Sequence, residues 1–136
     1  MAYQWDSSLE TGHVKIDNQH KQLIAALNNL IDASQSGKGD EEIFKTLDFL
    51  TGYTIMHFGD EEKLQVKYDY PDYLIHKRIH DDFKKTVGDL TKRLHDEGPR
   101  EELVGEVTGA VGAWLLNHIK GDDFRMATFV KLKEHE

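Results

Sequence analysis

The chain contains no cysteine and carries no excess of basic residues. Without cysteine it cannot form disulfides, thiolate zinc sites, iron–sulfur clusters or a cysteine nucleophile. The net charge is −8 and no basic cluster interrupts the acidic composition, which argues against nucleic acid or an anionic membrane as partner. The 136 residues predict one domain that can bury a core without covalent cross-links.

Long apolar runs are absent as well. No stretch approaches the roughly 20 apolar residues of a membrane span, and the start, Met-Ala-Tyr-Gln-Trp-Asp, lacks the charged and apolar regions of a signal peptide. We therefore expect a soluble cytoplasmic protein without membrane contact, whether complete or excised as a domain from a longer chain. Nothing in the pattern predicts an obligate oligomer.

Four segments show the apolar period of an amphipathic helix, and turns containing glycine or proline separate them. Helices of this length with short connections pack as antiparallel neighbours. The sequence therefore predicts an all-α fold, namely an up-down-up-down antiparallel four-helix bundle. In this single domain (1–136) the helices are expected at about 17–36, 40–68, 72–97 and 100–120.

Two segments lie outside these helices. Residues 1–16 have no helical period, so we expect an extended arm that packs on the bundle through apolar residues such as Trp5 and Leu9. Asp17 is a suitable N-cap for the first helix. Gly121 favours helix termination, which predicts a short tail at 121–136.

Two ligand pairs stand out in the second and third helices. His57 and Glu61 are four residues apart, and so are His76 and His80. Residues at this spacing share one helix face, one turn apart, so each pair can bind a single ion. In the acidic run around Glu61, only Glu61 falls on the buried face, and we expect the neighbouring Glu62 to be solvated.

The antiparallel topology predicts where further ligands meet these pairs. The end of the second helix lies beside the start of the third, and the end of the fourth lies beside the start of the first. Asp123 follows His118 by five residues and needs a break at Gly121 to reach inward. The candidate metal ligands at this one level are His20, His57, Glu61, His76, His80, His118 and Asp123.

A buried metal centre is the best interpretation of this set. Buried imidazoles and carboxylates are costly unless they are paired or bind metal. A structural zinc takes about four ligands, whereas seven nitrogen and oxygen ligands suit two octahedral ions that share carboxylate bridges and leave one position open. Zinc, iron, copper and nickel all accept such ligands, and two iron ions fit best. The other histidines, His13, His95 and His135, are interpreted as surface groups.

These motifs resemble those of the hemerythrin family, in particular the bacterial hemerythrin-like domains. The similarity covers nearly the whole chain, from Trp5 and the D-x-Q-H ending at His20, through H-x-x-x-E and H-x-x-x-H, to the H-I-x-x-x-D that ends at Asp123. The resemblance implies a non-haem di-iron centre with an oxo or hydroxo bridge, which binds dioxygen reversibly.

The same resemblance implies a role for each residue. One iron takes His76, His80 and His118, the other takes His20 and His57 and keeps the open position, and Glu61 and Asp123 bridge both. An apolar oxygen pocket is implied at Leu23, Phe58, Phe83, Trp114, Leu115 and Ile119. None of these pocket residues is an acid or a base, which favours a carrier or sensor over an oxidase.

The sequence thus predicts a protein that is not an enzyme and that binds dioxygen for sensing, delivery or storage. Two alternatives stay open: a di-iron oxidase, peroxidase or nitric oxide reductase, and a structural or zinc-binding bundle. Domains of the family occur alone or joined to signalling modules such as chemotaxis receptors, so a fused or separate signalling module is a further expected partner.

Overall fold

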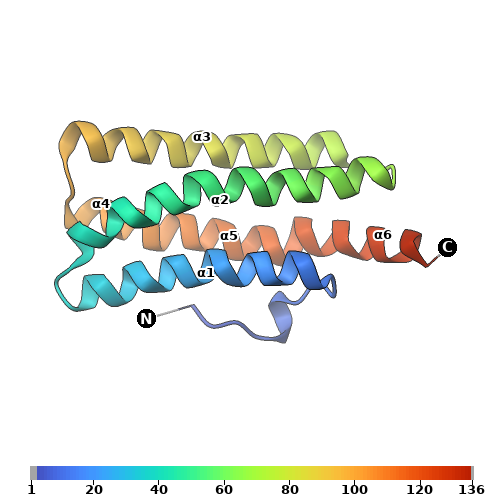
Figure 1. The fold of residues 1–136 in the computed structure, drawn as a ribbon, viewed down its shortest axis with the longest axis horizontal. Helices are drawn as coiled ribbons and strands as arrows, with labels where there is room; N and C mark the ends of the chain where they lie inside the picture. Colours follow the sequence, from blue (N-terminus) through green and yellow to red (C-terminus); the bar gives the residue numbers. More distant parts are fainter. Residues whose placement is uncertain (1–2, 136) are drawn as a thin grey trace.

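Four helical rods run alternately up and down in the computed structural model, which describes residues 3–135 (Figure 1). The first three rods are α1 (Val14–Gln35), α2 (Gly39–Lys67) and α3 (Tyr73–Glu97). The fourth rod comprises α4 (Glu101–Glu106), α5 (Gly112–His118) and α6 (Phe124–Glu134), joined by π-helical turns at Val107–Val111 and Ile119–Asp123. The predicted all-α bundle is confirmed.

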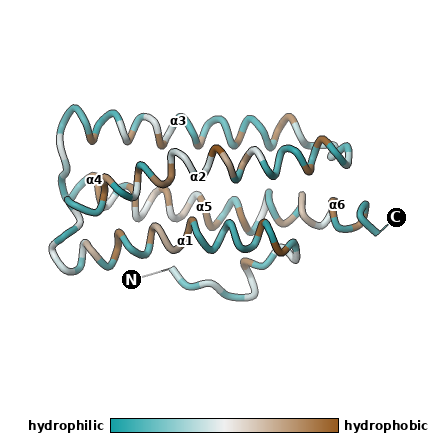
Figure 2. The backbone as a smooth tube through the Cα atoms, in the orientation of Figure 1, coloured by the Kyte–Doolittle hydropathy of each residue, from teal (hydrophilic) through white to brown (hydrophobic). Residues whose placement is uncertain are grey.

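The apolar stripes of the helices meet in one long core. Brown apolar positions recur along each helix between teal polar ones (Figure 2), because residues three or four apart share a helix face. Leu27, Leu47 and Leu90 are among the core residues contributed by α1, α2 and α3. Within residues 3–135, no helix combines the length and the apolar character needed to cross a membrane.

The first helix begins earlier than predicted. It starts at Val14, and His13 is its N-cap, with Nδ1 of His13 accepting a hydrogen bond from the backbone N–H of Ile16 at 3.5 Å. The carboxylate of Asp17 instead accepts hydrogen bonds from the backbone N–H and the hydroxyl of Thr11, at 2.9 and 2.7 Å. Asp17 therefore orders the loop before the helix, and the predictions of Asp17 as N-cap and His13 as a solvated surface group were wrong.

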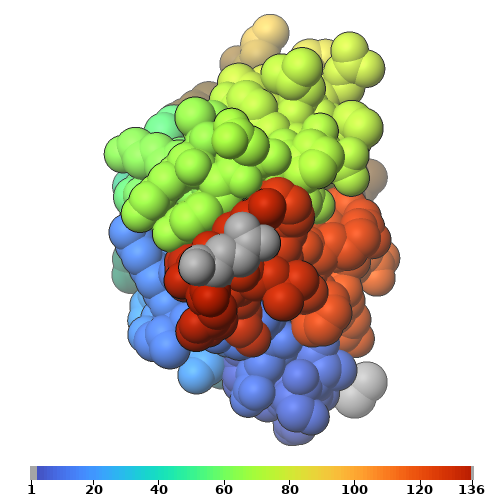
Figure 3. Space-filling view, turned by 90° about the vertical axis from the view of Figure 1, so that its right-hand side faces the viewer, coloured from blue at the N-terminus to red at the C-terminus, as the bar shows by residue number. Residues whose placement is uncertain are grey.

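The predicted tail at 121–136 was also wrong. The helix continues through Gly121, which takes part in a π-helical turn, and α6 extends to Glu134. Burial overrides the helix-ending preference of glycine here, because α6 packs Met126 and Val130 against Ile16. Figure 3 shows the red atoms of α6 between the α2–α3 connection and the start of α1, at the end of the bundle.

The N-terminal arm is attached to the bundle by specific hydrogen bonds. The hydroxyl of Tyr3 donates to the carbonyl of Thr108 at 2.6 Å, and the Asn28 side chain pairs with both backbone groups of Tyr3 at 2.7 and 2.8 Å. Trp5 packs against the core and Leu9 is buried within it. The arm therefore covers part of α1 and of the fourth rod.

A glycine substitution tests this attachment. A Cβ on Gly112 would lie 2.5 Å from Cζ of Tyr3, whereas a Cβ on Gly105 would meet nothing within 4 Å. We expect Gly112→Ala to lower the free energy of unfolding by about 1–3 kcal/mol through overpacking. Gly105→Ala should raise it by about 1 kcal/mol through helix propensity. Urea unfolding measures both changes.

The cause can be isolated in a second background. When Tyr3→Ala removes the ring, Gly112→Ala should become as favourable as Gly105→Ala. A destabilisation that persists without the Tyr3 ring would contradict the assigned contact.

Candidate metal centre

All seven predicted ligands lie inside one end of the bundle, and none is more than 3% exposed. Each rod supplies at least one of them, so the site depends on the whole bundle. The α1 helix supplies His20, α2 supplies His57 and Glu61, α3 supplies His76 and His80, and the fourth rod supplies His118 and Asp123.

The π-helical turn Ile119–Asp123 explains how Asp123 reaches the site without a break at Gly121. In a regular α-helix, a residue five positions on is rotated by roughly 140° from the first. A π-helical turn has i→i+5 geometry, which returns Asp123 to the face of His118. Nε2 of His118 lies 3.0 Å from Oδ1 of Asp123.

The two oxygens of Glu61 face different histidines. Oε1 lies 3.1 Å from Nε2 of His80 and 3.8 Å from Nε2 of His76. Oε2 lies 3.3 Å from Nε2 of His57 and 3.5 Å from Nε2 of His20. The carboxylate of Glu61 therefore spans two groups of imidazoles.

Asp123 spans the same two groups. Its Oδ1 lies 3.0 Å from Nε2 of both His76 and His118, and its Oδ2 lies 2.8 Å from Nε2 of His20. Two sets of side chains each offer ligand atoms within 4.8 Å of one another, and both sets share Glu61 and Asp123. The remaining members are His76, His80 and His118 in one set, called the three-histidine group below, and His20 and His57 in the other, the two-histidine group.

The buried donor atoms at this centre fit a pair of cations. In the described part of the chain, both oxygens of Glu61 and Nε2 of His57 and His80 are buried without a hydrogen-bond partner. Their neighbours are close enough for ion pairs but are not aligned for hydrogen bonds. A buried acceptor without a hydrogen-bond partner lowers the stability of the fold. Cations held between the two carboxylates would provide the missing partners. Imidazole and carboxylate together suit iron.

In the absence of a cation, the carboxylates favour protonated imidazoles. Burial lowers the pKa of His20, but the carboxylates of Asp123 and Glu61 outweigh burial and raise it to about 9. Burial likewise lowers the pKa of His118, while Asp123 and Asp122 raise it to about 10. Burial raises the pKa of Glu61 and Asp123, but the surrounding imidazoles hold both well below the ordinary values.

Three further residues orient the imidazoles, and sequence reasoning did not identify them. Nδ1 of His57 is 2.6 Å from Oε1 of Gln19, and Nδ1 of His80 is 2.9 Å from Oε2 of Glu62. Glu62 is therefore not the solvated group that was predicted. The third is Asp122, whose Oδ2 is 2.9 Å from Nδ1 of His118.

Such partners turn Nε2 of each ring toward the centre and fix the tautomer of the imidazole. The contact of Asp122 with His118 could have been predicted from the sequence, because the two residues are four positions apart and share a helix face. Gln19 and Glu62 directly adjoin predicted ligands, which gives no comparable spacing signal.

Five of the six residues of the expected oxygen pocket belong to the apolar core, and Trp114 packs against it. Five are buried, and Trp114 is partly buried. The ring of Phe58 stacks on that of His80 with centroids 3.8 Å apart, and Trp114 stacks on His118 at 4.6 Å. Phe83 also stacks on Trp114, with centroids 4.0 Å apart. The other buried pocket residues are Leu23, Leu115 and Ile119.

Comparison with known proteins agrees with this arrangement. The family model of the hemerythrin HHE cation binding domain matches residues 11–130. The chain belongs to the hemerythrin family. Bacteriohemerythrin of Pseudomonas aeruginosa (strain UCBPP-PA14) is 37% identical over 119 residues, which is 88% of this chain and 75% of that protein.

Other hemerythrin-family proteins match over similar lengths. Myohemerythrin of Theromyzon tessulatum is 32% identical over 123 residues, covering 90% of this chain and 89% of the relative. The crystal structure of a wild-type hemerythrin superposes with a TM-score of 0.83 at 31% identity, covering 96% of this chain and 98% of the other. The match in structure therefore extends over the whole bundle.

The metal-free form of this hemerythrin-family chain should lose stability at high pH. The raised pKa values of His20 and His118 contribute to the free energy of unfolding. This contribution is fully present below their ordinary pKa of 6.5 and is lost as the pH rises through about 9 to 10. The lowered pKa values of Glu61 and Asp123 give a contribution that is lost on acidification below about pH 4.

Thermal melting of chelator-treated protein across this pH range measures the effect. The iron-loaded protein is the control, because metal binding requires neutral imidazoles and so removes the alkaline loss. Equal alkaline losses of melting temperature in both forms would contradict the assignment.

Proposed function

We propose that this protein binds dioxygen reversibly at a non-haem di-iron centre, for sensing, delivery or storage. One observation carries the proposal: Glu61 and Asp123 each direct one oxygen toward the three-histidine group and the other toward the two-histidine group. A bridging carboxylate requires this arrangement, whereas a mononuclear site does not. Membership of the hemerythrin family, with relatives named bacteriohemerythrin and myohemerythrin, supports it.

In this proposal each group would hold one iron ion. His76, His80 and His118 would bind one ion, His20 and His57 would bind the ion with the open position, and Glu61 and Asp123 would be shared between the two, together with a solvent-derived oxo or hydroxo bridge. Two ferrous ions would supply the electrons for reversible dioxygen binding. The chain itself supplies the ligands, their orientation and a dry environment.

The pocket residues favour binding over turnover. Leu23, Leu115 and Ile119 are at most 2% exposed and offer no polar atom on their side chains. An apolar lining excludes water from the centre, and no acid or base among the six pocket residues can deliver a proton to a bound ligand. Together with membership of the hemerythrin family, this lining supports an oxygen-binding protein rather than an enzyme. A fused or separate signalling module would be its partner in a sensing role.

Loading with ferrous iron under nitrogen tests the proposal. We expect two iron ions per chain and a visible absorption band that appears in air and disappears under vacuum. Continuous oxygen consumption with a reductant, without a reversible band, would instead indicate a di-iron enzyme. A colourless protein that binds zinc but no iron would also contradict the proposal.

A matched pair of substitutions tests the pocket. Ile119→Thr and Ile119→Val remove similar volume from a fully buried position, but only Thr introduces a hydroxyl. We expect the air-induced band to decay several-fold faster in Ile119→Thr than in Ile119→Val, because the hydroxyl admits water. Stopped-flow absorbance measures the decay. Equal lifetimes of the band in the two variants would contradict the assignment of Ile119 to the pocket.

A further inference from the structure

Two of the three imidazoles in the three-histidine group have an outer hydrogen bond to a carboxylate. Nδ1 of His80 pairs with Glu62 at 2.9 Å, and Nδ1 of His118 pairs with Asp122 at 2.9 Å. The other oxygen of Asp122 accepts a hydrogen bond from Arg125 at 2.6 Å, which offsets part of its charge. Glu62 interacts electrostatically with Lys77, whose ammonium makes its direct ion pair with Asp81 at 3.2 Å. Both partners therefore carry a negative charge that a nearby cation offsets only in part.

The two-histidine group has no such carboxylates. Nδ1 of His57 donates to the neutral amide oxygen of Gln19 at 2.6 Å. Nδ1 of His20 is buried and has no hydrogen-bond partner within residues 3–135. The amide nitrogen of Gln19 donates to Asp60 at 2.8 Å, and Lys15 lies 3.5 Å from the same oxygen of Asp60. The Gln19 amide thus separates His57 from the carboxylate of Asp60, which is paired with a cation.

This difference has a direct electronic consequence. A carboxylate that accepts the Nδ1–H proton makes Nε2 of the ring a stronger donor to the metal. Stronger donation and nearby negative charge stabilise the higher oxidation state, since outer hydrogen bonds and net charge set the reduction potentials of protein-bound iron. The three-histidine group is therefore the better environment for ferric iron, and the two-histidine group the better one for ferrous iron.

We infer that Glu62, Asp122 and Gln19 polarise the centre, so that removal of one electron leaves ferric iron at the three-histidine group and ferrous iron at the two-histidine group. This inference rests on the proposed function. The three side chains act through the imidazoles and are positioning residues. The arrangement keeps the ion with the open position in the state that binds dioxygen.

A charge exchange between the two sides tests the inference. Gln19→Glu places a carboxylate behind His57. Asp60→Asn in the same chain replaces the acceptor that Gln19 used with an amide, which can donate to the new carboxylate and avoids charge repulsion. Glu62→Gln makes the opposite change behind His80, exchanging a carboxylate for an amide. Asp60→Asn alone is the control for the double variant.

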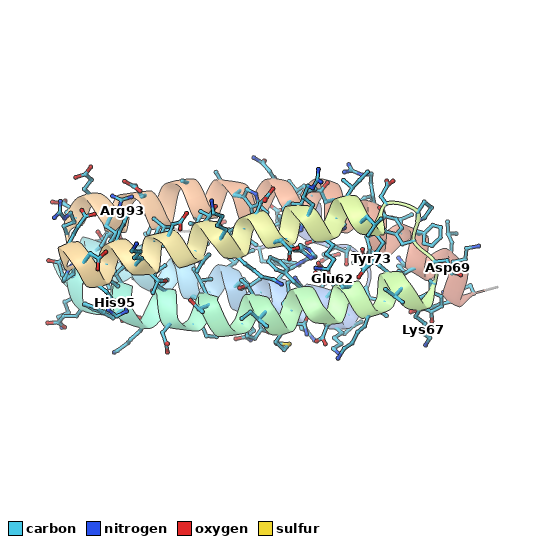
Figure 4. All side chains as sticks on the ribbon, turned by 90° about the horizontal axis from the view of Figure 1, so that it is seen from above. Glu62, Lys67, Asp69, Tyr73, Arg93 and His95 are labelled. Atoms are coloured by element: carbon cyan, nitrogen blue, oxygen red, sulfur yellow. The ribbon has the colours of Figure 1, made fainter. Side chains whose placement is uncertain are left out.

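A distant charge provides a second control. Glu106→Gln removes one carboxylate, which pairs with Arg93. Figure 4 shows Arg93 close to one end of the bundle and Glu62 in the other half, so this change alters the net charge without touching the centre.

Each iron-loaded variant is oxidised stepwise from the diferrous form with hexacyanoferrate(III). Each step transfers one electron to the oxidant, which becomes hexacyanoferrate(II), and no bond in the chain forms or breaks. Glu62→Gln should shift the first potential to a more positive value, and the double variant should shift the second to a more negative one. Each of these two variants should narrow the gap between the two potentials by about 59 mV. This corresponds to a roughly tenfold lower equilibrium constant for forming the one-electron-oxidised form from the diferrous and diferric forms.

The outcomes separate this inference from the function on which it rests. Iron analysis and Mössbauer spectroscopy report whether each variant holds two iron ions, and Asp60→Asn and Glu106→Gln should leave the gap unchanged. Two iron ions per chain with unchanged potentials, or with both variants shifting the same potential in the same direction, would overturn the inference alone. Failure of the unsubstituted protein to bind two iron ions would overturn the proposed function and the inference together.

Discussion

Two carboxylates without access to solvent control the structure of one end of this bundle. Glu61 and Asp123 are both fully buried, and five imidazoles surround them. Two negative charges at this depth are stable only when positive charge lies between them, as protons on imidazoles or as metal ions. The ligand-bearing helices therefore have one requirement in common, which is to hold those imidazoles at the level of the carboxylates.

Helix geometry meets this requirement in two ways. On α2 and α3 the ligands stand four residues apart and share a face. On the fourth rod a π-helical turn places Asp123 against Nε2 of His118, while the preceding residue, Asp122, pairs with Nδ1 of the same ring. Consecutive residues thus contact both nitrogens of one imidazole. Apolar layers above and below the centre, one of them formed with α6, keep it dry.

The sequence predicted the bundle and the family because both depend on patterns that extend over the whole chain. The local predictions failed where two signals compete. Asp17 resembles an N-cap, yet its carboxylate orders the preceding loop. Gly121 resembles a helix end, yet the burial of α6 carries the helix through it. Gln19 has no signature of its own, since its role depends on the distance to His57 across two helices.

The central claim is that Glu61 and Asp123 join two metal ions between the histidine groups. A crystal structure of the iron-loaded protein, with anomalous scattering measured at the iron edge, tests this most directly. We expect two iron peaks within about 4 Å of each other. Each peak should lie in contact with both carboxylates and with the imidazoles of one histidine group. A single peak, or two peaks of which one lies outside this cluster, would contradict the central claim.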